Sequence, residues 1–295
     1  MKKLLSILVS LALLAWIYSR IDVAALGRAL RTCDPLWLAA GLGILAPIKL
    51  IQAWRLRQLM PRGSSLPAAE SLRLILVADV LNMILPSKMG DIAKAWFMKK
   101  RGHLGGSLAL SLVVFEKAYD VLSLLLWCAV GLLFYPAKDR PLWLLTWAVL
   151  AMLVGGFLLL GSAGFARLAF SLAGRLSPMR FRAKIERLRG SWTETQGYFR
   201  AERAQLRRVT ALSIGLWLVH FLQLWMFILA LNAWTPFLLH IALSSVAILA
   251  GLFPLTFAGL GTRDAALITL YRPWFGPPTA AALGILFTSR YVLPA

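Results

Sequence analysis

The chain has 295 residues, of which 60% are hydrophobic and 15% charged, and its formal net charge is +20. This balance excludes an ordinary soluble domain and is typical of a polytopic membrane protein. A basic chain also suits nucleic-acid binding, but the sequence has no zinc-ligand spacing, RNA-binding signature or basic tail, so we expect no nucleic-acid partner. Lys and Arg gather in cytoplasmic loops of membrane proteins, where they face anionic lipid. We therefore expect a multi-pass protein of the cell (inner) membrane.

Apolar segments that could cross a bilayer, which takes about 20 residues, recur along the chain. The first, 3–19, begins after two lysines and ends with Trp16 and Tyr18, a pattern that favours an uncleaved transmembrane helix over a cleaved signal peptide. Further candidates are 36–54, 104–134, 141–161, 209–231 and 237–257. The sequence predicts an all-α membrane helix bundle and a single domain over 1–295. It has about 6–8 transmembrane helices, with two re-entrant or broken helices.

The segment 74–87 is one of the two irregular pieces. If it crossed the bilayer, the basic loops 88–103 and 162–208 would both lie outside, against the positive-inside rule. About 13 helical residues reach roughly 20 Å, which is short of a core of about 30 Å. We therefore predict a re-entrant helix that ends at Pro86, with Lys88, Asp91 and Lys94 at the mouth of a cavity. The N-terminus is then cytoplasmic.

The long loop 162–208 interleaves basic residues with Phe, Leu, Ile and Trp. We interpret it as a basic cytoplasmic interfacial segment, whose helices lie along the membrane face and are attracted to acidic lipid.

A second irregular piece is 265–293, which is broken by "RPWFGPP" at 272–278. Just before it, "LAGLFPLTFAGLGTRDAAL" at 249–267 repeats the order seen in "LNMILPSKMGDIAKA": an apolar run, a proline, a small loop, a glycine and an acid. Paired broken helices in a membrane protein point to a transporter's binding site. The alternative is that proline and glycine merely end helices at the interface.

Three charges lie inside the apolar stretch 104–134, in "FEKAYD". Glu116 and Asp120 are four apart and share a helix face, and Lys117 can pair with Asp120. Each charge in a membrane core costs about 2.5–3.5 kcal/mol or more, so an intramembrane cluster is a functional hypothesis by default. The functional interpretation is a head-group or proton site, and the alternative is an ion pair that locks helices together.

The histidines and cysteines give weaker signals. His220 and Gln223 share a face of an apolar segment, and we favour a polar pair between packed helices over a catalytic role. Cys33 and Cys128 predict neither a disulfide nor a metal cluster. No nucleotide-binding loop is present, and we expect no cofactor, no metal and no catalytic residue.

Taken together, "NMILPSKMGDIAKA", "FEKAYD" and "PLTFAGLGTRDAAL" resemble the signature of the lysylphosphatidylglycerol synthase transmembrane domain family, also called flippase-like membrane proteins. The resemblance covers essentially the whole chain and implies a protein associated with lipid translocation. Family members usually carry Arg at the positions of Lys94 and Lys117 and Glu at that of Asp264. Bifunctional members add a soluble aminoacyl-transferase domain. Because this sequence ends at residue 295, we expect a stand-alone member without synthase activity.

The expected function is a flippase that binds and translocates an anionic or aminoacylated phospholipid, or a polyprenyl-linked lipid, without chemical change. The alternatives are a non-catalytic membrane partner of a lipid-modifying transferase and a membrane-embedded lipid-phosphate enzyme. Cations would bind the phosphate, acids would hold the cations or an amine, and glycines would let backbone N–H groups approach. The expected head-group-binding residues are Asn82, Pro86, Lys88, Gly90, Asp91, Lys94, Glu116, Lys117, Asp120, Gly259, Gly261, Arg263 and Asp264.

Overall fold

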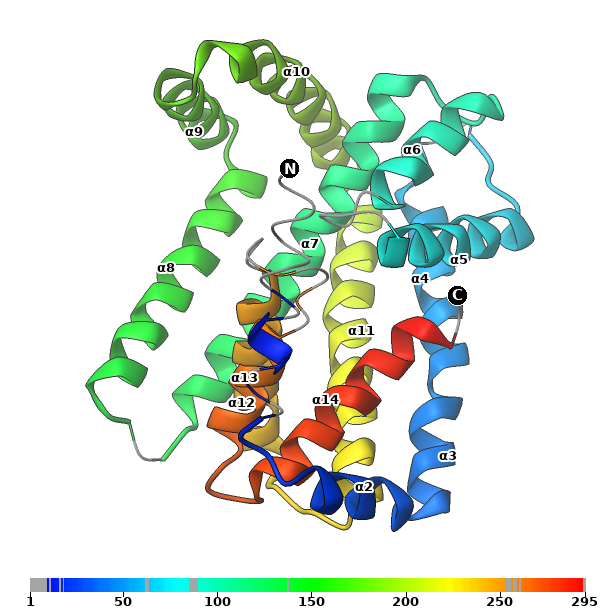
Figure 1. Ribbon diagram of the computed structural model, residues 1–295. Helices are drawn as coiled ribbons and strands as arrows, with labels where there is room; N and C mark the ends of the chain where they lie inside the picture. The colour runs from blue at the N-terminus through cyan, green and yellow to red at the C-terminus, as the bar shows by residue number, and fades with distance from the viewer. Residues whose placement is uncertain are drawn as a thin grey trace.

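A computed structural model describes residues 10, 12–15, 17, 19–61, 64–84, 90–136, 138–252, 256, 259 and 261–293. All regular secondary structure in this part of the chain is helical, which confirms the predicted all-α class (Figure 1). Ten of the 17 residues of the predicted first span, 3–19, lie outside it. The helices are α2 (Val23–Arg31), α3 (Pro35–Gly43), α4 (Leu45–Leu59), α5 (Ala68–Ile84), α6 (Gly90–Lys100), α7 (Gly106–Leu133), α8 (Arg140–Gly161), α9 (Ala163–Leu176), α10 (Met179–Ala201), α11 (Arg203–Ala230), α12 (Phe237–Leu252), α13 (Thr262–Leu270) and α14 (Pro277–Val292).

The long helices run side by side and form the body of the bundle (Figure 1). Within the described residues, three helical stretches are long and apolar enough to cross a membrane: Pro35–Leu59, which joins α3 and α4, Arg140–Gly161 and Arg203–Ala230. α7 adds a fourth long helix of 28 residues. Long helices are therefore present at the predicted spans 36–54, 104–134, 141–161 and 209–231. The first of them extends past residue 54 to Leu59 and the last begins at Arg203, so both reach into the neighbouring basic segments.

α5 and α6 pack against each other at one end of the bundle, near α9 and α10 (Figure 1). The basic segments 64–73, 90–103 and 162–208 consequently lie at the same end, as the prediction that 74–87 turns back requires. α5 begins at Ala68, earlier than expected, because Glu70 suits the first turn of a helix and accepts a hydrogen bond from Arg101. Gly90 permits the close approach, since a Cβ there would lie 2.2 Å from the Ala78 carbonyl oxygen. Pro86 and Lys88 lie outside the described residues.

α12 and α13 form a second hairpin. α12 has 16 described residues, roughly 24 Å, and most of the remainder of the span predicted at 237–257 lies outside the described residues. Its first turn is joined to the end of α13, because His240 Nδ1 lies 2.7 Å from the Tyr271 hydroxyl. The two helices are therefore antiparallel and return to the same end. The predicted break after 265 is confirmed, since α13 ends at Leu270 and α14 starts at Pro277.

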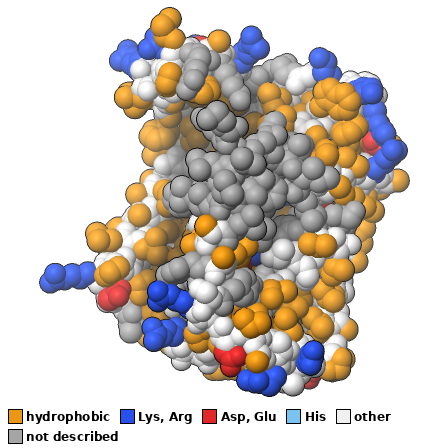
Figure 2. Space-filling view, in the orientation of Figure 1, with side chains coloured by type: hydrophobic (Ala, Val, Ile, Leu, Met, Phe, Trp, Pro, Cys, Tyr) orange, Lys and Arg blue, Asp and Glu red, His pale blue; other side chains and the backbone are white. Residues whose placement is uncertain are grey.

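α9 and α10 extend beyond the end of α8 as a separate arm (Figure 1). The arm is held to the bundle by Trp192, whose ring centroid lies 5.8 Å from that of Phe115 on α7. Gln196 also donates to the carbonyl oxygen of Leu160, at 2.7 Å, near the end of α8. Figure 2 shows Lys and Arg gathered at the two ends of the molecule and hydrophobic side chains between them, as expected for a membrane-spanning bundle.

Tight packing between α7 and α12 depends on Gly131. A Cβ added there would meet the backbone of Ala242, at 2.6 Å from its nitrogen and 2.7 Å from its Cα. We predict that Gly131→Ala lowers the free energy of unfolding by about 1–3 kcal/mol, because backbone atoms cannot move aside as a side chain can. Thermal unfolding in detergent measures the change. Gly155→Ala is the matched control, since nothing lies within 4 Å of its added methyl group, and an equal loss in both variants would contradict the prediction.

Candidate functional site

Arg55 is the centre of the candidate site. It lies near the end of α4, and only 2% of its surface is exposed. Its Nη2 is 3.0 Å from Glu116 Oε1, and its Nη1 contacts the Asp120 carboxylate and donates to Ser213 Oγ at 3.1 Å. One guanidinium group thus joins α4 to α7 and α11, which its fixed fork of donors makes possible.

Two lysines complete a closed network with these carboxylates. Lys94 Nζ lies 2.6 Å from Glu116 Oε2 and 3.4 Å from Asp91 Oδ1. Lys117 Nζ lies 3.1 Å from Asp91 Oδ2 and 3.3 Å from Asp120 Oδ2, which confirms the predicted Lys117–Asp120 pair. We call the resulting closed loop the ionic ring, in which cations and carboxylates alternate in the order Arg55, Glu116, Lys94, Asp91, Lys117 and Asp120.

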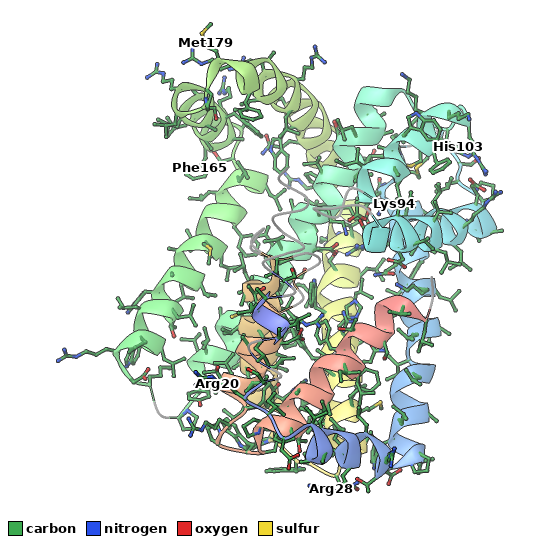
Figure 3. All side chains as sticks on the ribbon, viewed as in Figure 1. Arg20, Arg28, Lys94, His103, Phe165 and Met179 are labelled. Atoms are coloured by element: carbon green, nitrogen blue, oxygen red, sulfur yellow. The ribbon has the colours of Figure 1, made fainter. Side chains whose placement is uncertain are left out.

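Local helix geometry explains how the ring is built. Glu116 and Asp120 lie one turn apart on α7 and both face Arg55, as their spacing predicts. Asp91 and Lys94 lie three residues apart on α6, and Figure 3 shows Lys94 where α6 passes α5 and α7. Asn82 on α5 donates to Asp91 at 3.4 Å, so the α5–α6 hairpin orients this carboxylate.

The ring is electrically neutral and unevenly buried. Arg55, Lys94 and Glu116 have side chains only 2% exposed, whereas those of Asp91 and Asp120 are 10% and 19% exposed. The Lys117 side chain is 42% exposed. Three cations matched by three carboxylates offset much of the cost of placing charge in hydrocarbon. The ring therefore has a closed side at Arg55 and an open side at Lys117.

A second polar group lies on α13 and α14. Arg263 Nη2 donates to Asp264 Oδ1 at 2.8 Å and to Thr288 Oγ1 at 2.7 Å. Asp264 Oδ2 accepts a 3.0 Å hydrogen bond from the Gly261 N–H. The carboxylate therefore caps the start of α13, and this backbone N–H is already engaged. Gly261 has φ of +97°, a conformation that favours glycine. Gly259 also has positive φ, +75°, and packs against the backbone of Gly251.

The two groups are adjacent but are not joined by a direct ion pair among the described contacts. Arg263 and Arg290 both lie over the ring of Phe287, at 4.2 and 4.4 Å from its centroid. Arg290 in turn lies within electrostatic range of His220 on α11, as do Arg55 and Asp120. α14 also contacts α5 and α11. The structure thus brings Asn82, Gly90, Asp91, Lys94, Glu116, Lys117 and Asp120 together, and places Gly259, Gly261, Arg263 and Asp264 in the neighbouring group.

Sequence reasoning missed Arg55 and Ser213. Arg55 lies directly after the predicted span 36–54. A signal was present, because Lys49, Gln52 and Arg55 recur every third residue in an otherwise apolar helix. That spacing indicates a polar helix face that continues beyond the predicted end of the span.

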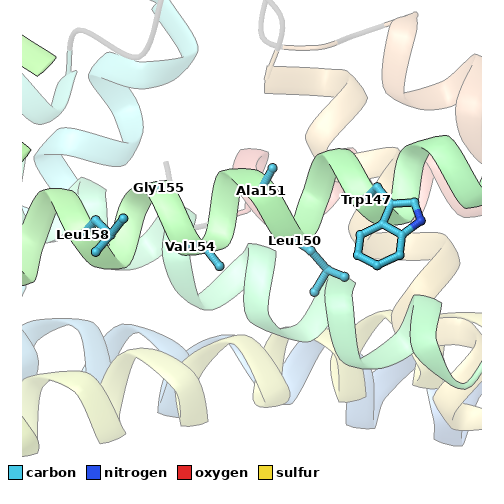
Figure 4. Close-up of a pocket in the computed structure, with 6 residues that line it drawn as sticks. All are labelled: Trp147, Leu150, Ala151, Val154, Gly155 and Leu158. Carbon is cyan, nitrogen blue, oxygen red and sulfur yellow. The ribbon is translucent and has the colours of Figure 1, made fainter.

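An apolar groove lies on α8, away from the ionic ring (Figure 4). Its volume is about 480 Å³, and it is lined by Trp147, Leu150, Ala151, Val154, Gly155 and Leu158. These residues occupy one face of the helix, at spacings of three and four. Because none of them is charged, the groove suits a hydrocarbon chain and does not suit a polar head group.

The ring makes Arg55 essential for stability. We predict that Arg55→Met lowers the free energy of unfolding by about 3–5 kcal/mol, because Glu116 and Asp120 lose a buried cation that they share. Arg189→Met is the matched control. Its pair with Glu186 is solvent-exposed, at 44% and 60% for the two side chains, and should contribute about 0–1 kcal/mol. Thermal unfolding measures both, and similar losses would contradict a structural role for the ring.

Comparison with known families agrees with the motifs. The model of the family described as "Lysylphosphatidylglycerol synthase TM region" matches residues 3–294. A search of curated proteins found no match. The matched region includes both hairpins and every member of the ionic ring. The chain belongs to the lysylphosphatidylglycerol synthase transmembrane region family, and it is an integral membrane protein of a lipid-related family.

Proposed function

We propose that the protein is a lipid flippase, which binds the head group of a membrane lipid at the ionic ring and carries it across the bilayer without chemical change. The observation that carries this proposal is a closed ring of three cations and three carboxylates with one exposed corner, Lys117, held between a re-entrant hairpin and a long helix. A flippase needs polar groups inside the membrane that replace the water around a head group.

Exchange of ion-pair partners explains how a neutral ring could bind a lipid phosphate. A phosphate that reaches Lys117 can replace Asp91 and Asp120, which are the two most exposed carboxylates of the ring. The released carboxylates are then available to an amino group. The ring therefore suits an anionic or aminoacylated phospholipid or a polyprenyl-linked phosphate, while Arg55 and Glu116 keep the helices in place.

The apolar parts of the lipid have a separate place in this proposal. Hydrocarbon chains would remain in the bilayer along apolar surfaces such as the α8 groove. The hairpins α5–α6 and α12–α13 return to opposite ends of the bundle (Figure 1), so movement of one against the other would expose the ring to either leaflet in turn. A lipid-modifying transferase could act before or after this step as a partner.

The charge distribution supports a location in the cell (inner) membrane with a cytoplasmic N-terminus. The end that carries α6, α9 and α10 also carries the most basic segments, including 162–208. Basic segments stay on the cytoplasmic side of bacterial-type membranes and face anionic lipid there.

We predict that Lys117→Met lowers leaflet exchange at least tenfold in vesicles, because the exposed cation of the ring is lost. Purified protein is reconstituted, and exchange of a fluorescent anionic phospholipid is followed by quenching in the outer leaflet. Lys138→Met is the matched control. This lysine lies near the other end of the bundle, where its Nζ is 4.6 Å from the centroid of the Trp143 ring, and its loss should leave exchange unchanged.

The same experiment separates the proposal from its alternatives. Exchange of chemically intact lipid, lost in Lys117→Met, supports the flippase. A chemically altered lipid, detected by mass spectrometry, would support a membrane-embedded lipid-phosphate enzyme. Folded protein that gives neither exchange nor reaction would overturn both and leave the role of a non-catalytic transferase partner.

Orientation has its own test. With Cys33 and Cys128 changed to serine, Arg140→Cys should react with a membrane-impermeant maleimide in intact cells, and Arg175→Cys should react only after lysis. Arg175 lies on the arm and Arg140 begins α8 at the other end of that helix. The opposite labelling pattern would reverse the proposed topology.

A further inference from the structure

Polar residues continue from the ionic ring into the interior along the contact between α4 and α11. On α4 they are Lys49, Gln52 and Arg55, which lie three residues apart, and on α11 they are Ser213, His220 and Gln223. Both helices belong to stretches apolar enough to span a membrane. A polar strip inside such helices persists only where its members find partners.

Some members of the strip have such partners. At the end of the strip next to the ionic ring, Arg55 donates to Ser213. At the opposite end, Gln223 Nε2 donates to the Gly41 carbonyl oxygen at 2.9 Å. Ten residues of α11 separate these two bonds, which is roughly 15 Å along the helix. Between them, Lys49 pairs with Asp79 of α5 at 2.6 Å. The strip is thus a continuous feature that links α3, α4, α5 and α11.

Other atoms of the strip are buried without a hydrogen-bond partner in the described part of the chain. They are Gln52 Oε1, Arg55 Nε, His220 Nδ1 and Gln223 Oε1. Arg55 is 2% exposed and Gln223 is fully buried. A buried polar atom left unpaired costs about 1–3 kcal/mol, and proteins usually satisfy such groups with ordered water that bridges several of them. Four such atoms on two touching helices point to a shared chain of water.

Burial and ring packing along the strip favour water over a lipid head group as its ligand. Ser213 and Gln223 are fully buried, and the Trp217 ring packs 5.5 Å from that of His220, centroid to centroid. Water and protons are small enough to enter, whereas a phosphate with its substituents is not. The strip therefore differs in its ligand from the ionic ring, which is open at Lys117.

We infer that this strip is a hydrated seam that admits water between α4 and α11 and relays protons to the ionic ring through His220. The imidazole takes a proton from water on one ring nitrogen and gives a proton from the other to water of the seam, which delivers it to a ring carboxylate such as Asp120. The neutralised carboxylate then releases its cation, and no other bond is made or broken. Histidine suits this relay because one ring nitrogen can accept a proton while the other donates one.

The charges around His220 favour a relay over proton storage. Lys49 and Arg55 on α4, Arg290 on α14 and Asp120 on α7 all lie within electrostatic range of the imidazole. The three cations repel an imidazolium and outnumber the one carboxylate that attracts it, so the proton moves on to the carboxylate side. The relay rests on the proposed flippase function, because it would couple head-group release to a proton gradient, whereas hydration of the seam does not depend on transport.

Hydration is tested by cysteine accessibility in membranes, in a chain that carries Cys33→Ser and Cys128→Ser. Silver ion is the probe, since it is small and reacts with thiolates that water reaches. Gln52→Cys and His220→Cys should react at least tenfold faster than two controls on α11, Leu224→Cys in the apolar core and Leu218→Cys on the lipid side. Rates no higher than those of Leu224→Cys, in protein that remains folded, would overturn the seam.

The relay is tested in the lipid-exchange assay with and without a pH gradient across the vesicle. Wild-type exchange should accelerate several-fold under the gradient. His220→Phe should keep the basal exchange rate and lose the acceleration, while Leu218→Phe should behave as wild type. Absence of acceleration in the wild-type protein, or its retention in His220→Phe, would overturn the relay. Absence of any exchange would instead contradict the proposed function, and silver labelling would still decide hydration.

Discussion

Six charged side chains in a membrane interior must neutralise one another, and the ionic ring does this with alternating signs around a closed loop. Each charge alone would cost several kcal/mol in hydrocarbon. Because every cation contacts two carboxylates and every carboxylate contacts two cations, the removal of one member leaves two others undercompensated. The four long-range contacts that Arg55 and Lys94 make with Glu116, Asp120 and Ser213 also fix the positions of α4, α6, α7 and α11. The same network therefore stabilises the bundle and creates its most polar interior surface.

The α5–α6 and α12–α13 hairpins bring backbone and charged side chains to the middle of the protein. α5–α6 supplies Asn82, Asp91 and Lys94 from one end, and α12–α13 supplies Arg263 and Asp264 from the other. Close packing of each hairpin depends on glycine, at Gly90 in the first and at Gly259 and Gly251 in the second. Both hairpins thereby place charged side chains among packed helices, where Lys94 and Arg263 are buried.

Polarity is graded through the molecule. The ring is exposed at Lys117 and closed at Arg55, and the polar groups beyond Arg55 are amides, a hydroxyl, an imidazole and the Lys49–Asp79 ion pair. The α8 groove, by contrast, has only apolar lining. The ring, the strip and the groove therefore offer three chemically distinct surfaces. This separation matches what the proposed function needs for a head group, for water and for hydrocarbon.

Sequence and tertiary structure determined different parts of this description. Hydropathy and charge determined the helical class, the long helices α7, α8 and α11, and the common end of the basic segments, because the bilayer constrains length and charge locally. Helix periodicity also placed Glu116 and Asp120 on one face. Partner choice was not local: Arg55 meets Glu116 and Asp120 across separations of 61 and 65 residues. The turn of α12 back onto α13 depends in the same way on the contact of His240 with Tyr271, 31 residues away. Such contacts arise only when helices pack, so the ring's closure and the second hairpin were decided by the tertiary structure.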